Sequence, residues 1–328
     1  MRMLKAKSRS AAMIAATLLP LACASAAQAQ AQDYPSRDIH VVVGYVAGTG
    51  PDLYARYAAD LIRQGSGGKT VLVDNKVGAM SNIAAGQVAR AKADGYTVFV
   101  TGGSTFTTNP FLFKEVPFKL ADFAPVTTLQ RGGLVFITKP ESGIKSLKEL
   151  VAFLKQKDGK AKFGYVNPLA FGAAEYLKQR SGTKAIPIAY KGAPDALMGL
   201  SGGEVDFMVS DPTPIMGSRD KYNVLAVTTE TRVDAMPDVP AMKESGYDNF
   251  DLSGWWAVWM PAGTPDSIVA KVDDWIEAGL KKPEAKEFFY RGGFQPWIGV
   301  RGEKLKEFAE KEYKKWGEII KLTNIEPQ

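Results

Sequence analysis

The sequence predicts an α/β protein with two lobes, each built on a mainly parallel sheet flanked by helices, with crossover strands that link the lobes. Strand-like and helix-like patterns alternate from residue 39 to residue 100, and such alternation is typical of a parallel sheet. The alternation begins again after about residue 130. No long linker separates the two parts, which indicates lobes that share strands.

The first unit reads as strand, helix, strand, helix, strand. Residues 39–43 form a continuous apolar run, which predicts a strand buried on both faces. Asp52 is a candidate N-cap for a helix with apolar residues between 53 and 62. Strands are expected at 71–73 and 96–100, and a helix is expected at 83–92 between them.

The second unit repeats this order with shorter strands. The predicted strands are 134–137, 163–166, 186–189, 205–209 and 224–227, and the helices between them are 147–154, 172–180 and 194–200. An aromatic strand follows at 255–260, and the helices 265–280, 283–290 and 302–320 close the chain. We assign residues 32–128 and 254–328 to lobe 1 and residues 129–253 to lobe 2, with hinges near 126–134 and 250–256.

The first 31 residues predict a cleavable signal peptide. Four basic residues precede an apolar stretch from Ala11 to about Ala27, and small-residue cleavage sites follow near Ala29 and Ala31. The apolar stretch is short and rich in alanine for a membrane span of about 20 residues. A lipoprotein interpretation of Cys23 stays open, although Pro20 stands where an aliphatic residue is usual. Export to the periplasm is therefore expected.

Composition excludes several classes of function. The 328 residues carry a formal charge of +6, but residues 1–31 hold four of the 41 basic residues and none of the 35 acidic ones. The expected mature chain is therefore near neutral, which gives no support for nucleic-acid binding. The single cysteine, Cys23, lies in the signal segment, so disulfides, cysteine nucleophiles and thiolate metal sites are not expected.

Four polar, glycine-bearing loops follow predicted strands. They are Gly44–Asp52, Gly78–Asn82, Thr101–Asn109 and Tyr190–Pro194. In open α/β sheets ligands bind beyond the carboxyl ends of the strands, and backbone N–H groups at the helix starts there favour anions. Ordinary turns are the alternative for any one loop, but four such loops indicate a binding cleft.

Catalytic chemistry has few candidates. His40 is the only histidine, and its place within the first strand favours a buried, hydrogen-bonded structural role. Gly48-Thr49-Gly50 lacks the third glycine of a dinucleotide-binding fingerprint, because Leu53 stands there. No Ser nucleophile elbow is present, and neither a metal nor a cofactor is expected. A carboxylate pair stays open as an alternative.

Two further groups of residues have two interpretations each. Asp211 ends a predicted strand and either faces the cleft or caps the helix beside Pro212. Trp255, Trp256 and Trp259 favour packing in the core and at the hinge over a platform for a sugar ligand.

The sequence resembles the Bug-type solute-binding receptors of tripartite tricarboxylate transporters along essentially the whole mature chain. Single motifs are weak, but nine occur in the family's order. They are Tyr34-Pro35-Ser36-Arg37, Asn75-Lys76-Val77-Gly78-Ala79, Asp94-Gly95-Tyr96-Thr97, Asp122-Phe123-Ala124-Pro125-Val126, Tyr190-Lys191-Gly192, Gly202-Gly203-Glu204-Val205-Asp206, Leu225-Ala226-Val227-Thr228, Met236-Pro237-Asp238-Val239-Pro240 and Pro261-Ala262-Gly263-Thr264-Pro265.

The resemblance implies a two-lobe periplasmic binding protein fold of the Venus-flytrap type, a non-catalytic role, and delivery of a small organic acid to membrane permease subunits. We expect a monomer. The implied ligand-binding residues are Tyr45, Gly48, Thr49, Gly50, Ala79, Met80, Gly102, Gly103, Ser104, Thr105, Asn167, Tyr190 and Asp211. An exported enzyme that uses carboxylates and a ligand sensor acting on a signalling partner are the alternatives.

The sequence departs from the family in two loops. Thr49 and Met80 stand where glycine is usual, and the second-lobe loop reads Val166-Asn167-Pro168-Leu169-Ala170-Phe171 instead of a segment rich in glycine and serine. The cleft is therefore expected to be more apolar on that side. This predicts a ligand with an apolar or aromatic body and one carboxylate end.

Overall fold

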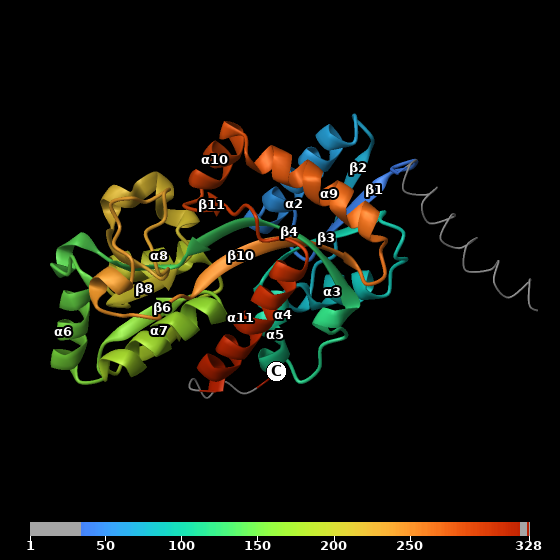
Figure 1. Cartoon of the computed structure of the whole chain (residues 1–328). Coiled ribbons are helices and arrows are strands. Elements are labelled where there is room, and N and C mark those ends of the chain that lie inside the picture. Colours follow the sequence, from blue (N-terminus) through green and yellow to red (C-terminus); the bar gives the residue numbers. More distant parts are fainter. Residues whose placement is uncertain (1–33, 322–326, 328) are drawn as a thin grey trace, which may run out of the picture.

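The structure is a computed structural model that describes residues 34–321 and residue 327. The predicted signal peptide and Cys23 lie outside the described residues. The chain forms two sheets with helices packed around them, and the two long strands β4 and β10 run through the middle of the molecule (Figure 1). The two-lobe α/β architecture expected from the sequence is confirmed.

The first sheet has the strand order β11-β4-β10-β3-β1-β2. Its strands are β1 (Ile39–Val43), β2 (Val71–Asn75), β3 (Thr97–Gly102), β4 (Phe123–Gly133), β10 (Ser253–Pro261) and β11 (Gln295–Pro296). The second sheet has the order β7-β6-β8-β5-β9. Its strands are β5 (Val135–Thr138), β6 (Lys162–Tyr165), β7 (Ile186–Ala189), β8 (Phe207–Ser210) and β9 (Asn223–Val227).

Both sheets are mixed, with a parallel half and an antiparallel half. β1 pairs in parallel with β2 and β3, whereas β10 is antiparallel to β3 and β4. In the second sheet β6 is parallel to β7 and β8, and β5 is antiparallel to β8 and β9. The antiparallel pairs arise where the chain passes between sheets: Leu134 alone separates β4 from β5, and the chain returns from β9 to β10. The lobe boundaries near 128 and 253 remain a prediction.

The helices cover both sheets. Those beside the first sheet are α2 (Gly50–Gly65), α3 (Asn82–Ala89), α4 (Ser104–Thr107), α5 (Asn109–Leu112), α9 (Asp266–Leu280) and α10 (Pro283–Tyr290). Those beside the second sheet are α6 (Leu147–Lys157), α7 (Pro168–Ser181) and α8 (Ala193–Gly202). α7 begins four residues before the predicted start at 172. The reason is that the Asn167 side chain caps it by accepting a hydrogen bond from Ala170 N at 2.8 Å.

The last helix, α11 (Glu303–Lys321), packs against both sheets. Leu305 and Ala309 belong to the hydrophobic cluster that contains Phe99 of β3, whereas Trp316 and Ile319 belong to the cluster of the second sheet. Figure 1 shows the helix crossing from the side of α4 and α5 towards α7. The end of the chain therefore connects the two cores, each of which buries large apolar side chains from helices and strands.

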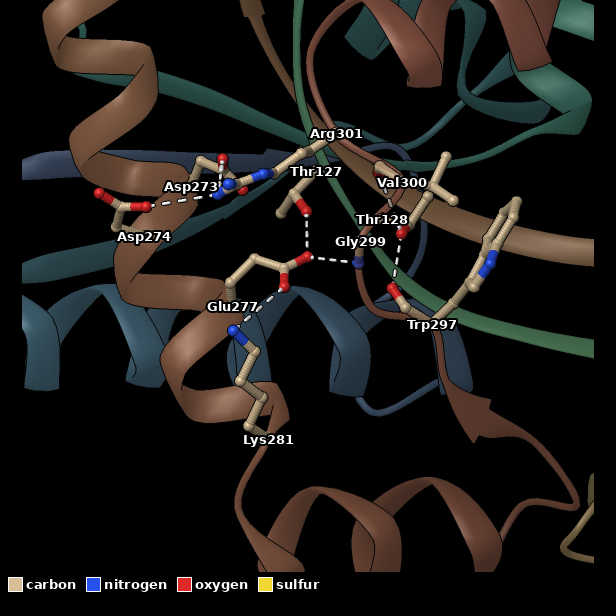
Figure 2. A network of polar contacts seen from close by, with 10 residues as sticks. All are labelled: Thr127, Thr128, Asp273, Asp274, Glu277, Lys281, Trp297, Gly299, Val300 and Arg301. Atoms are coloured by element: carbon tan, nitrogen blue, oxygen red, sulfur yellow. Dashed lines mark hydrogen bonds and ion pairs between the residues drawn. The ribbon is translucent and has the colours of Figure 1, made fainter.

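A buried polar network holds the segment 297–301 against the first sheet and α9 (Figure 2). Thr128 Oγ1 of β4 donates to the carbonyl oxygens of Trp297, at 2.5 Å, and Val300, at 3.2 Å. Arg301 forms an ion pair with Asp273 of α9 at 2.9 Å. Neutral and charged hydrogen bonds thus replace apolar packing along this part of β4.

His40 is hydrogen-bonded, as expected, but it is not buried. Its Nδ1 atom lies 2.9 Å from Asp74 Oδ2 on the neighbouring strand, and 43% of its side chain is exposed. The pairing with β2, an edge strand, leaves this face of the sheet open. The histidine therefore joins two strands and lies apart from the cavity described next.

Candidate functional site

A cavity of about 490 Å³ is lined by residues of loops, helices and strands around both sheets. We call it the central cavity. Its described lining residues are Tyr45, Gly50, Pro51, Tyr54, Met80, Gly102, Gly103, Ser104, Thr107, Thr108, Asn109, Asn167, Leu169, Asp211, Thr213, Pro214, Ser253, Gly254, Trp255, Trp256, Phe294 and Trp316. The volume falls within the range typical of small-molecule sites, about 300–1,000 Å³.

Eight of the thirteen residues predicted from the sequence line this cavity. They are Tyr45, Gly50, Met80, Gly102, Gly103, Ser104, Asn167 and Asp211. They come from loops at the ends of β1, β3, β6 and β8 and from the segment before α3. The carboxyl ends of these strands therefore meet at one place, as expected for an open α/β sheet. Their contact with a ligand remains a proposal.

The other five predicted residues lie behind or beside the cavity wall. Gly48 and Thr49 form the turn before α2, where Thr49 Oγ1 donates to the carbonyl oxygen of Val46 at 2.7 Å. The Thr105 hydroxyl is fully buried and lies 2.7 Å from Thr101 Oγ1. Ala79 precedes Met80 without lining the cavity, and Tyr190 packs against Gly199 of α8 and Gly164 of β6. Tyr190 therefore supports the second sheet.

Asp52 holds the first cavity loop in place. Its buried carboxylate accepts hydrogen bonds from Gly48 N, Asn75 Nδ2 and Arg56 Nε, each at 2.8 Å. Asn75 Nδ2 also donates to the carbonyl oxygen of Tyr45 at 2.8 Å. The acidic side chain in the first turn of α2 therefore fixes the backbone that carries Tyr45 into the cavity, and its charge suits the positive end of the helix.

Met80 reaches the cavity from a backbone segment in the left-handed region. Ala79, Met80 and Ser81 have φ angles of 45°, 50° and 77°, which non-glycine residues rarely adopt. The Met80 carbonyl oxygen accepts a hydrogen bond from Asn109 Nδ2 at 2.8 Å, and the same nitrogen donates to Asn82 Oδ1 at 2.7 Å. Asn109, which lines the cavity, thus holds the strained turn in one conformation.

Gly103 is a glycine because a ring lies against its backbone. A Cβ atom at this position would stand 2.1 Å from Cε2 of Trp255, far inside any allowed contact. Gly103 N donates to the carbonyl oxygen of Trp255 at 2.8 Å. The loop after β3 and the start of β10 are therefore in direct contact, and the cavity wall there consists of backbone and an indole ring.

Asp211 is the single charged side chain among the described lining residues. It follows β8 directly, and its Oδ2 atom accepts a hydrogen bond from Asn167 Nδ2 at 3.3 Å. Burial raises the pKa of the carboxyl group, and the hydrogen bond from Asn167 opposes that change. No Lys, Arg or His lines the described wall. The interpretation of Asp211 as a residue that faces the cleft fits this position.

Two tyrosines line the cavity beside the first sheet, Tyr45 in the loop after β1 and Tyr54 on α2. Burial raises the pKa of the Tyr45 hydroxyl; a hydrogen bond with Ser104 lowers it, and the charge of Asp211 raises it again. Burial also raises the pKa of Tyr54, and Asp211 adds to this effect while a hydrogen bond with Thr213 opposes it. Both tyrosines and Asp211 therefore line the same cavity.

Aromatic rings form much of the remaining wall, and the sequence analysis did not place them there. Tyr54, Trp255, Trp256, Phe294 and Trp316 all line the cavity. The predicted core role holds for Trp259, which is fully buried. Tyr54 stands one helical turn after Gly50, so helical periodicity could have identified it. Phe294 stands 38 positions after Trp256 and Trp316 stands 60 positions after it, and no local pattern connects them to the site.

The described residues contain no group of three or more His, Cys, Asp or Glu side chains that could hold a metal ion. None of the described helices is long and apolar enough to cross a membrane. The site therefore offers hydroxyl, amide and backbone groups, one carboxylate and several rings.

Comparison with known proteins identifies related sequences. Residues 54–325 match the model of a family described as the tripartite tricarboxylate transporter family receptor. The BugT protein of Bordetella pertussis is 30% identical over 305 residues, covering 91% of this chain and 93% of its own length. A UPF0065 protein of Agrobacterium vitis is 32% identical over 295 residues, covering 87% of this chain and 82% of its own length.

Solved structures with the same fold include the periplasmic binding protein BugD. It is 30% identical to this chain, with a TM-score of 0.73, and the match covers 90% of this chain and 100% of BugD. A Rhodopseudomonas palustris protein solved with adipate is 25% identical, with a TM-score of 0.77, and the match covers 90% of this chain and 100% of that protein.

Proposed function

Because this chain belongs to the tripartite tricarboxylate transporter receptor family, we propose that it is a periplasmic solute receptor. It binds a small organic carboxylate in the central cavity and delivers it to membrane permease subunits of the tripartite type. The observation that carries this proposal is the central cavity itself, which combines neutral donors and aromatic walls from both sheets. The related protein solved with adipate supports a carboxylate as the ligand.

Neutral groups bind the carboxylate in this proposal. The N-terminal residue of α2, Gly50, lines the cavity, and so does Leu169 in the first turn of α7. The positive ends of these two helices therefore point towards the guest, and such ends favour anions without a basic side chain. The hydroxyls of Tyr45 and Ser104 add hydrogen-bond donors.

The walls favour a guest with an apolar or aromatic body. Trp255, Trp256, Trp316, Phe294 and Leu169 surround the polar groups. Burial of apolar surface contributes roughly 25 cal/mol per Å² to binding before entropic costs are subtracted. A ring or branched chain would therefore gain more from this cavity than a small, fully hydrophilic acid would.

Closure of the two lobes over the guest follows from the position of the cavity. Its wall contains Tyr45 and Ser104, which follow strands of the first sheet, and Asn167 and Asp211, which follow strands of the second. A guest that contacts both sides stabilises the closed state more than the open one, and this difference drives closure. The proposed hinges are the β4–β5 junction at Leu134 and the chain before β10.

We propose a receptor rather than an enzyme because the described wall has one carboxylate and no second carboxylate to form a catalytic pair. Glycoside hydrolysis, for example, uses such a pair of carboxylates. The export signal, the monomeric state and the permease as partner are parts of the same proposal. A sensor that acts on a signalling partner would use the same cavity, and genes for two permease subunits beside this gene would favour transport.

Native mass spectrometry of the protein purified from its periplasm tests the function first, because the mass of a ligand that stays bound during purification can be measured directly. A thermal-shift panel then compares benzoate, phenylacetate and branched aliphatic monocarboxylates with small hydrophilic acids such as succinate and citrate. Apolar monocarboxylates are expected to raise the melting temperature most, and chromatography of each mixture should return the acid unchanged. Stabilisation by hydrophilic acids alone would contradict the apolar body, and conversion of the acid would contradict the receptor.

A further inference from the structure

A short segment beside the first sheet reaches across to the second sheet at the wall of the central cavity. We call residues 290–295, which join α10 to β11, the strap. The strap is anchored in the first core, because Phe289 just before it and Phe294 within it are buried in the cluster that contains Val258 of β10. Phe294 also lines the cavity, so the strap forms part of the cavity wall.

Three hydrogen bonds connect the strap to segments around the second sheet. Thr213 Oγ1 donates to the carbonyl oxygen of Gly292 at 3.0 Å. Tyr290 Oη donates to Asp234 Oδ2 at 3.2 Å, and Asp234 N donates to Gln295 Oε1 at 3.1 Å. All three bonds lie in exposed positions, where water competes with each of them.

The partners of the strap are anchored in the core of the second sheet. The short helix after β8, η4 (Thr213–Lys221), buries Ile215 in that core. Asp234 directly follows Val233, which is buried in the same cluster. Thr213 also lines the cavity. The strap and η4 therefore meet at the cavity wall, although they belong to different cores.

Two adjacent glycines let the strap approach the second core closely. A Cβ atom at Gly293 would stand 2.6 Å from Cβ of Pro212, and Gly293 has a φ angle of 77°, which other residues rarely adopt. Gly292 stands directly before it. A pair of glycines has wide backbone freedom, so the strap can move away from η4 by rotation at these two residues.

The strap and α11 connect the two cores on opposite faces of the first sheet (Figure 1). The helix before the strap, α10, packs on the face of β10 that carries Val258 and Met260, whereas α11 packs on the face that carries Ala257 and Trp259. The connection through α11 buries Trp316 in the second core. Buried apolar surface is costly to separate, but exposed hydrogen bonds exchange with water at little cost. The side of the strap is therefore the side that opens.

We propose that the strap is the gate of the central cavity: its contacts with Thr213 and Asp234 break, and it moves away from η4, each time a guest enters or leaves. This inference rests on the proposed function, because it describes how the receptor exchanges its guest. Among the described strap residues only Phe294 lines the cavity. The gate therefore governs the rate of guest exchange more than the choice of guest.

An engineered disulfide tests the gate directly. A Cβ atom at Gly292 would stand 3.3 Å from Thr213 Oγ1, so cysteines at the two positions are close enough to bond, and the expected mature chain has no other cysteine. Stopped-flow fluorescence measures the association and dissociation of phenylacetate, or of the panel acid with the largest thermal shift, in the Thr213→Cys/Gly292→Cys protein. Oxidation is expected to slow both rates by about tenfold or more, because lid opening then limits exchange, and reduction should restore them.

The oxidised and reduced forms of this variant carry the same substitutions, so the comparison isolates the cross-link. A second variant weakens the gate without one. Tyr290→Phe removes the donor to Asp234 and keeps the ring, so dissociation is expected to become about two- to tenfold faster, the factor that one hydrogen bond corresponds to. Tyr313→Phe makes the same change on α11, outside the strap, and should leave the rate unchanged.

The outcomes separate this inference from the proposed function. Equal exchange rates in the oxidised and reduced forms would overturn the gate and leave the carboxylate receptor in place. Failure of the disulfide to form in the folded variant, as judged by circular dichroism, would also overturn the gate, because Gly292 and Thr213 would then not be neighbours in solution. Failure of every acid of the panel to bind the wild type would overturn the proposed function and the gate together.

Discussion

The carboxylate of Glu277 accepts a hydrogen bond from the hydroxyl of Thr127 at 3.1 Å, although the two residues are 150 positions apart in the chain. The same Oε1 atom accepts a second hydrogen bond from Gly299 N at 2.9 Å. Glu277 lies on α9, Thr127 on β4 and Gly299 in the segment after β11 (Figure 2). One buried carboxylate therefore connects α9, β4 and the segment after β11.

Replacement of Glu277 by leucine is expected to lower the free energy of unfolding by about 1–3 kcal/mol, because the Thr127 hydroxyl and Gly299 N would be left buried without an acceptor. Lys281 pairs with the other oxygen at 4.0 Å, but 65% of its side chain is exposed. Lys281→Met should therefore cost less than about 1 kcal/mol. Urea denaturation of both variants measures the difference, and an equal loss in the two would show that the ion pair carries the effect.

Two cavity glycines should respond in opposite ways to alanine. At Gly103 the added Cβ would stand 2.1 Å from the ring of Trp255, whereas at Gly50 the nearest atom, the Tyr54 hydroxyl, is 3.9 Å away. Gly103→Ala should cost roughly 1–3 kcal/mol of stability because the ring and the loop must separate. Gly50→Ala has room and should be neutral or stabilising by up to about 1 kcal/mol.

Melting temperatures of the two glycine variants give the comparison directly. A Gly103→Ala protein as stable as the wild type would mean that Trp255 moves freely in the cavity wall. Gly50 serves as the matched control, since it also lines the cavity and also follows a loop after a strand.

The sequence predicts the elements of this fold better than the pairing of its strands. The apolar run of β1 and the spacing of α2 are local signals, and both elements form. The N-cap prediction is wrong, because α2 begins at Gly50 after Thr49 and Asp52 lies in its first turn.

No strand is predicted from the sequence for β4, because Thr127, Thr128 and Gln130 are polar although all three are buried. The partners of Thr127 and Thr128 come from α9 and the segment 297–301, and no local pattern reveals such distant hydrogen bonds. The antiparallel pairing of β10 likewise depends on how the chain passes from the second sheet back to the first, which no local pattern encodes.

The residues of the site also divide into those that local sequence predicts and those that distant packing places in the cavity wall. Loops with glycine at strand ends predicted Gly102, Gly103 and Ser104 in the cavity wall, because that rule depends on local sequence and on one property of parallel sheets. Trp316 enters the wall because α11 crosses both cores. Its role depends on the packing of a distant helix, which the periodicity of α11 does not encode.

Asp52 should make both stability and binding depend on pH. Burial opposes ionisation, but hydrogen bonds from Arg56, Asn75 and Gly48 more than offset it and hold the pKa of this carboxyl group below its ordinary value. Its contribution to stability is therefore complete above the unfolded pKa of about 3.9 and disappears as the pH falls through the folded pKa. Below about pH 4 the wild type should lose stability more steeply than Asp52→Asn does.

Denaturation curves from pH 7 to pH 2.5 for wild type, Asp52→Asn and the exposed control Asp220→Asn measure this difference. Asp52→Asn should also weaken binding of any ligand at pH 7, since Asp52 and Asn75 together hold the loop that carries Tyr45. An Asp52→Asn curve parallel to the wild type over the acid range would show that folding does not lower the pKa of this carboxyl group.

Ligand binding should be visible in tryptophan fluorescence, and one residue should provide most of the signal. Trp256 lines the cavity and remains partly exposed, so an enclosed guest changes the polarity around its indole ring. Trp275 is also partly exposed, but it stacks on Tyr34 with ring centroids 6.0 Å apart and does not line the cavity. Titration of Trp275→Phe with a bound acid should therefore keep the fluorescence change, whereas Trp256→Phe should lose most of it. A change that survives in Trp256→Phe but disappears in Trp275→Phe would place the guest outside the central cavity.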